Sequence, residues 1–199
     1  MRYVEQVTAR PAEVRAPRPG DDIITGPDVV MDRAFDVPGT PAEVWPWLLQ
    51  LGKRRAGWYL PRRVERLLPP SRRGLRHVDD RFTRLTVGDV IPDWGGKDET
   101  FTVAELEPPE HLVYRSQRGR TTVSWAICLR PAGQTGTRVH LRLRLGPVKH
   151  VSLAERVGGA FDLVTIVLLA AGLRERLDPR GRLRSGRRHR PRRALPRHS

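Results

Sequence analysis

The sequence predicts an α+β domain in which a curved antiparallel sheet closes around one long C-terminal helix. Three observations lead to it. A strand pattern, two short helical patterns, a run of strand patterns and a long apolar helical pattern follow one another, and strands grouped apart from helices are typical of this class. The stretch TRVHLRLRLG, residues 137–146, alternates apolar and polar side chains, as a half-buried strand does. The length of 199 residues suits one domain with a single core.

The chain is expected to have three parts. Residues 1–28 are rich in proline, glycine and charge and show no sustained period, so they are predicted to form an arm leading into the domain. Residues 29–177 hold the strand and helix patterns. Residues 178–199 contain nine arginines and one aspartate, which supply +8 of the formal net charge of +15, and this tail is predicted to be disordered.

The first predicted elements are a strand and two short helices. VVMDRAFDV, residues 29–37, alternates as a strand. Thr40 and Glu43 form a capping-box pattern with proline at the first helical position, so a helix is predicted over 41–51, ended by Gly52. A second short helix is predicted within GWYLPRRVERLLPP, residues 57–70.

Further strands are predicted before the alternating stretch at 137–146. Their segments are residues 80–91, 100–110, 111–116 and 121–131, and AGQTG at 132–136 is predicted to be a hairpin loop. The polar positions of residues 137–146, among them His140, are expected to face solvent.

The last predicted element is a helix over residues 152–177, with Ser152 as N-cap and Glu155 three residues later. Its expected buried stripe follows a 3.6-residue period, and apolar residues around much of the circumference predict burial on more than one side. The apolar stretch 158–173 contains Asp162 and is judged too short to span a membrane. The stripe consists of Val157, Phe161, Val164, Leu168 and Ala171.

Composition and motifs bear on the cellular location of the protein and on whether it binds a cofactor. The first 17 residues lack the apolar core of a secretory signal, so a cytoplasmic protein is expected. The only cysteine, Cys128, is predicted to be a small buried apolar residue. The chain has neither a dinucleotide-binding glycine fingerprint nor a serine nucleophile elbow. No cofactor and no metal site is therefore expected.

Several motifs resemble the START-like superfamily, also called SRPBCC. They are PAEVWPWLLQLG with the following AGWY, then LTVGDVIPDW, FTVAELEPPEHLVYRS, and SWAICLRPAGQTGTRVHLRLR. The Trp-Pro-Trp-Leu pattern followed by Gly-Trp-Tyr is similar to a bacterial, uncharacterised branch near the polyketide cyclase/dehydrase and lipid-transport proteins. The resemblance covers about residues 29–177 and implies a helix-grip fold with an internal pocket for a small hydrophobic molecule.

Aromatic residues are the main candidates for that pocket, because they are scarce, 6% of the chain, and offer large flat surfaces. Each either lines the cavity or its mouth, or packs the helices and the sheet into the core. The candidates are Trp47, Trp58, Tyr59, Trp94, Tyr114, Trp125 and Phe161. His77 and Asp80 are candidate polar handles, with a plain polar loop as the alternative.

Three functions are considered from the sequence. The first is a carrier or sensor that binds a small hydrophobic ligand without chemistry. The second is a cyclase or dehydratase acting on a polyketide-like substrate in the same cavity, which would need a polar pair such as Tyr114 with an acid or a histidine. The third is nonspecific binding of the arginine-rich tail to nucleic acid or an anionic membrane. The codon bias of a GC-rich genome also explains the arginine excess, since lysine occurs at three positions and asparagine at none.

Overall fold

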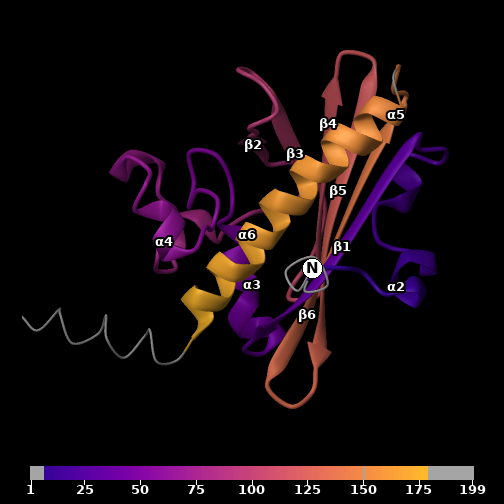
Figure 1. Ribbon diagram of the computed structural model, residues 1–199. Coiled ribbons are helices and arrows are strands. Elements are labelled where there is room, and N and C mark those ends of the chain that lie inside the picture. The colour runs from indigo at the N-terminus through magenta and orange to yellow at the C-terminus, as the bar shows by residue number, and fades with distance from the viewer. Residues whose placement is uncertain (1–6, 150, 179–199) are drawn as a thin grey trace, which may run out of the picture.

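The structure is a computed structural model, and it describes residues 7–149 and 151–178. Six strands form one antiparallel sheet in the order β1-β6-β5-β4-β3-β2 (Figure 1). The sheet and the long C-terminal helix confirm the predicted α+β class and the helix-grip arrangement. The strands are β1 (Val29–Pro38), β2 (Val90–Pro92), β3 (Thr100–Glu107), β4 (His111–Arg118), β5 (Thr121–Ala132) and β6 (Gly136–Gly146).

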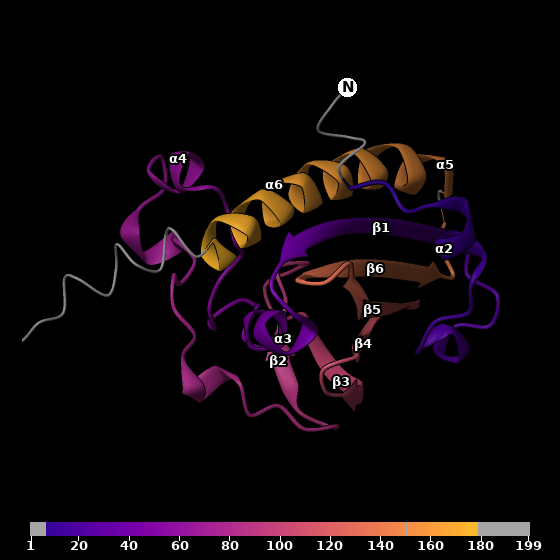
Figure 2. The same cartoon turned by 90° about the horizontal axis from the view of Figure 1, so that it is seen from below.

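The helices differ greatly in length. Figure 2 shows the sheet curving from β1, beside the long helix α6, round to β3 and β2, with α3 on the inner side. A short helix, α5, and one π-helical turn over Ala154–Gly158 precede α6, so the predicted C-terminal helix is present but not uniform. The helices are α2 (Pro11–Arg15), α3 (Pro41–Leu49), α4 (Arg62–Glu65), α5 (Val151–Leu153) and α6 (Gly159–Leu177).

The capping box at the start of α3 forms as predicted. The backbone N–H of Thr40 donates to Glu43 Oε2 at 2.8 Å, and the N–H of Glu43 donates to the carbonyl of Thr40 at 3.0 Å. The helix ends at Leu49, two residues before its predicted end, and Gly52, with φ of 149°, then turns the chain.

The strand predicted over residues 80–91 is largely wrong. The strand is confined to Val90–Pro92, which pairs with β3 at the edge of the sheet, and Gly88 and Asp89 add backbone hydrogen bonds with Val103. Residues Asp80–Phe82 form a 3₁₀ turn, which Asp79 caps by accepting from the N–H of Arg81 at 3.1 Å. The ring of Phe82 lies 5.4 Å from the guanidinium carbons of both Arg55 and Arg81. Capping and side-chain stacking thus replace the pairing that a strand here would need.

The buried face of α6 is not the predicted stripe. Val157, Phe161 and Val164 are exposed, Phe161 at 72%. The residues that face the core begin one turn later: Ile166, Leu169, Ala170, Leu173 and Leu177. Because the helix is apolar around most of its circumference, periodicity does not select the packed side.

Close packing at Gly172 fixes the rotation of α6. A Cβ atom built on Gly172 would lie 2.6 Å from the backbone carbonyl carbon and oxygen of Tyr59.

By length and composition, residues Arg156–Leu177 would suffice to cross a membrane, a property shared by core helices of soluble proteins. This helix is longer than the apolar stretch 158–173, and the expectation that it does not span a membrane stays a prediction.

The polar face of β6 is covered, which corrects the expectation that it faces solvent. His140 is 3% exposed and Arg142 is 5% exposed. The segment Val7–Asp28 lies over this face, and its acidic groups meet the strand: Glu13 contacts Arg138 at 2.8 Å and Asp21 contacts Arg142 at 2.8 Å. His140 Nε2 lies 2.9 Å from Asp32 Oδ1. The described part of the arm therefore forms a layer on the outer face of the sheet.

Candidate ligand-binding cavity

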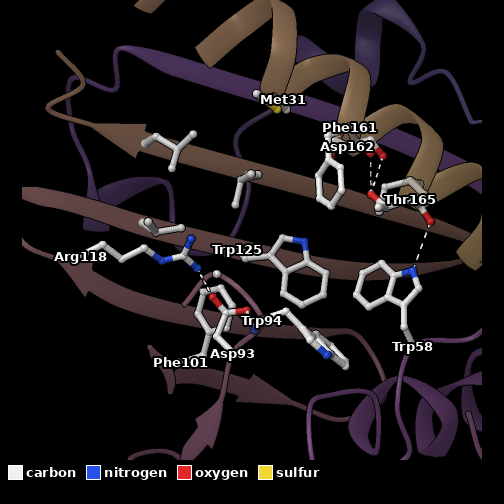
Figure 3. Close-up of a pocket in the computed structure, with 16 residues that line it drawn as sticks. Met31, Trp58, Asp93, Trp94, Phe101, Arg118, Trp125, Phe161, Asp162 and Thr165 are labelled. Carbon is white, nitrogen blue, oxygen red and sulfur yellow. Dashed lines mark hydrogen bonds and ion pairs between the residues drawn. The ribbon is translucent and has the colours of Figure 1, made fainter. Parts of the chain in front are cut away.

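A cavity of about 600 Å³ lies between the first turns of α6 and the concave face of the sheet (Figure 3). This volume falls in the range of sites that hold a drug-sized molecule. Strands β1, β3, β5 and β6 supply the apolar floor and walls, because their inward-facing positions alternate with outward-facing ones. The floor and walls are made by Met31, Phe101, Val123, Trp125, Leu143 and Leu145.

Aromatic rings form the inner wall. The ring of Trp58 lies 6.2 Å from that of Trp125 in a stacked arrangement and 5.7 Å from that of Trp94, edge to face. Phe101 lies 6.0 Å from Trp125. Trp58 is tied to α6, since its Nε1–H donates to the carbonyl of Thr165 at 3.3 Å. Flat faces at fixed spacing suit the stacking of a flat apolar ligand.

One ion pair lies on the side of the cavity away from α6. Arg118 pairs with Asp93 Oδ2, and its guanidinium carbon lies 5.4 Å from the centre of the Phe101 ring. The other oxygen of Asp93 accepts from the backbone N–H of Trp94 at 2.6 Å. Both oxygens of Asp93 are therefore engaged, and this pair positions Trp94 and Phe101.

A second carboxylate, that of Asp162 on α6, also belongs to the cavity lining. Its Oδ2 lies 2.8 Å from Nε of Arg33 on β1, and 17% of its side chain is exposed. Burial raises the pKa of Asp162 above its ordinary value, and the pairing with Arg33 offsets only part of that effect. Asp162 is thus an ionisable group held in mostly apolar surroundings.

The predicted aromatic candidates fall into two groups. Trp58, Trp94, Trp125 and Phe161 line the cavity. Trp47, Tyr59 and Tyr114 lie in the buried core and are not among its lining residues.

Tyr59 and Trp47 form one packed unit. The hydroxyl of Tyr59 donates to the carbonyl of Trp47 at 2.8 Å and accepts from Nε2 of Gln50 at 2.8 Å. Arg176 stacks 4.5 Å from the centre of the Tyr59 ring. These contacts account for the two aromatic residues as packing and hydrogen-bonding groups.

Tyr114 lies behind the cavity wall. Its ring stacks on that of Trp125 with centres 5.8 Å apart, and burial raises the pKa of its hydroxyl. That hydroxyl has no hydrogen-bond partner among the described residues.

His77 and Asp80 lie apart from the cavity lining. Both are exposed, on the loop between α4 and β2, and the carbonyl of His77 accepts from Gln50 Nε2 at 3.1 Å. Their roles as polar handles stay predictions. Within residues 7–149 and 151–178, no group of three or more histidine, cysteine or acidic side chains could hold a metal.

Sequence reasoning missed two charged residues of the cavity, Arg118 and Asp162. A signal existed for Asp162, the only charged residue in the apolar stretch 158–173. No comparable local signal marked Arg118, which is one arginine among many.

Comparisons with known proteins give similarities of overall fold. No family model matches the sequence, and no curated protein matches it. Among solved structures, CalU16 from Micromonospora echinospora is 16% identical, with 80% of this chain and 83% of that chain covered and a TM-score of 0.45. Protein XoxI from Bacillus cereus is 12% identical, covering 73% and 96%, with a TM-score of 0.45. Protein Ms6760 from Mycobacterium smegmatis is 10% identical, covering 73% and 90%, with a TM-score of 0.44. Similarities at this level carry no argument about ligand or activity.

Proposed function

We propose that this chain is a START-like carrier or sensor that binds a small, flat, apolar molecule in the cavity beneath α6. One observation carries the proposal: a space of about 600 Å³ is walled by stacked aromatic rings and aliphatic side chains. An apolar guest would be stabilised by about 25 cal/mol for each Å² of apolar surface removed from water.

The polar groups of the cavity lining suit a protein that binds a ligand better than an enzyme that transforms it. The arginines of the two ion pairs, Arg118 and Arg33, are both engaged with carboxylates. The tyrosine expected to polarise a substrate carbonyl, Tyr114, lies outside the lining. A cyclase or dehydratase would need a second proton-transferring group facing Asp162, and none of the described residues that line the cavity is a histidine or a tyrosine.

Filling the cavity tests the proposal. Leu143 lines the cavity beside its cross-strand neighbour Met31 of β1, so Leu143→Trp adds bulk where the guest would lie. We expect pyrene, followed by its own fluorescence and by quenching of protein tryptophan fluorescence, to bind the wild type and to bind the variant at least tenfold more weakly.

The matched control is Leu67→Trp, because Leu67 is exposed and outside the cavity lining. It adds the same indole to the chain and should leave pyrene binding unchanged. Equal pyrene affinity in the Leu143→Trp variant, with its fold intact by circular dichroism, would refute binding in this cavity.

A further inference from the structure

We propose that the guest carries a neutral hydroxyl group, which donates a hydrogen bond to Oδ1 of Asp162 and accepts one from Nε1–H of Trp125. This inference rests on the proposed function, because it names the class of molecule that the same cavity takes.

The carboxylate of Asp162 can accept a hydrogen bond from a guest. Its Oδ2 forms an ion pair with Nε of Arg33 at 2.8 Å, and neither carboxylate oxygen accepts a hydrogen bond from a described residue. Asp93, the other carboxylate of the cavity, has both oxygens engaged. A carboxylate oxygen in apolar surroundings is stabilised when a donor reaches it. The cavity therefore offers one strong open acceptor, on α6.

Trp125 supplies an open donor. Its Nε1–H makes no hydrogen bond within the described part of the chain, although its ring is held by Trp58, Phe101 and Tyr114. Figure 3 shows the indole nitrogen on the edge of the ring that faces α6 and Asp162. A hydroxyl group is both donor and acceptor, so a single hydroxyl serves the two residues.

The charges around the cavity favour a neutral group. Asp162 is balanced by Arg33, so an ammonium group would bring an unbalanced positive charge into an apolar space. An anionic group is not favoured either, because the guanidinium of Arg33 already makes hydrogen bonds within the protein. Its Nη1 donates to the carbonyl of Asp32 and its Nη2 to that of Gly159. Arg118 is likewise paired with Asp93.

Four pyrene derivatives distinguish a guest with a neutral hydroxyl from an apolar guest and from a cationic one. Pyrene gives the apolar baseline, 1-methylpyrene matches the added volume, 1-hydroxypyrene adds the hydroxyl, and 1-pyrenemethylamine adds a cation. At neutral pH we expect the wild type to bind 1-hydroxypyrene about tenfold more tightly than 1-methylpyrene, the size expected for one hydrogen bond to a charged group. The more polar probe would then bind better, against the trend that apolar burial alone gives.

Two variants assign the preference to Asp162. The double variant Arg33→Met with Asp162→Leu removes the ion pair without changing net charge, and it should abolish the hydroxyl preference while pyrene still binds. Arg33→Met alone frees the carboxylate, and it should keep the hydroxyl preference and improve binding of 1-pyrenemethylamine about tenfold.

The matched control is Arg81→Met with Asp79→Leu, which removes an ion pair that does not line the cavity. It should keep the wild-type order of affinities. If wild type binds 1-hydroxypyrene and 1-methylpyrene equally, or if the Arg33→Met/Asp162→Leu variant keeps the preference, the inference is overturned although the cavity still binds apolar guests. If Leu143→Trp leaves pyrene binding unchanged, the proposed function itself fails.

Discussion

At the scale of single residues, ion pairs between side chains far apart in the sequence attach the N-terminal segment to the outer face of the sheet. Arg138 meets Glu13 through two hydrogen bonds, Nε to Oε1 at 2.9 Å and Nη2 to Oε2 at 2.8 Å. Arg142 bridges Asp32 and Asp21, with Nε to Asp32 at 2.9 Å and Nη1 to Asp21 at 2.8 Å. These pairs hold the N-terminal segment against β6.

The pair of Glu13 with Arg138 predicts a dependence of stability on pH. The hydrogen bond from Arg138 lowers the pKa of Glu13 from 4.5 to about 2. A group whose pKa is lower in the folded state stabilises the fold above its unfolded pKa, and that contribution is lost as pH falls from about 4.5 towards 2. Glu13→Gln should therefore lower the free energy of unfolding by about 1 kcal/mol at neutral pH, as expected for a partly exposed pair.

Urea unfolding at neutral pH and near pH 2.5 measures this effect. The difference between wild type and Glu13→Gln should shrink at the lower pH, where Glu13 becomes partly protonated. Glu110→Gln is the control, because it makes the same change of charge at an exposed side chain. A difference of the same size at both pH values would show that charge pairing is not the cause.

At the scale of elements, α6 has two halves with different tasks. Its C-terminal half packs into the core through Leu169, Leu173 and Leu177. Its first turns stand over the cavity, where Asp162 and Thr165 face the guest space. Two glycines mark the difference: Gly172 is held within contact of Tyr59, whereas a Cβ on Gly159 would meet nothing within 4 Å.

The same substitution at these two glycines should have opposite effects. Gly159→Ala should raise the free energy of unfolding by about 0.5–1 kcal/mol, because alanine is the better helix former. Gly172→Ala should lower it by about 1–3 kcal/mol, because the added methyl forces α6 away from Tyr59. Denaturant unfolding of both variants measures this. Stabilisation by Gly172→Ala would contradict the packing described for α6.

The elements also show what the sequence determines locally. The existence of strand β6 and the capping box of α3 were predicted correctly, because each depends on neighbouring residues. The strand predicted over 80–91 was largely wrong, since a strand needs a pairing partner and residues 80–87 do not pair with β3. The buried face of α6 was also wrong, because an apolar circumference leaves the choice to tertiary contacts such as that of Gly172 with Tyr59.

The cavity was predictable mainly in its aromatic part. Trp58, Trp94 and Trp125 stood out because tryptophan is rare and large. The partners of Asp162 and Asp93 are Arg33 and Arg118, residues far from them in sequence. In a chain with 37 lysines and arginines, no local pattern singles out two arginines as the partners of these acids.

At the scale of the whole molecule, charge is concentrated at the C-terminal end. Residues 179–199 lie outside the described residues, and they contain nine arginines and no acidic residue. We propose that they bind nucleic acid nonspecifically, since such binding depends on phosphate neutralisation. The domain itself carries the cavity and would bind its guest without them.

Removing residues 179–199 tests this separation. The truncated chain should bind a random-sequence DNA duplex at least tenfold more weakly at low salt, and its salt dependence should flatten. Pyrene binding should not change. Fluorescence anisotropy of labelled DNA over a salt series measures the DNA affinity of each chain. Equal DNA affinity of the two chains would refute a role for the tail.

The central claim, that the hollow under α6 holds a small apolar guest, is tested most directly by native mass spectrometry of the protein purified from its own host. The wild type should carry a small molecule that denaturation releases, and Leu143→Trp, purified in parallel, should carry none. A wild-type protein without any bound mass, and without affinity for pyrene, would contradict the claim.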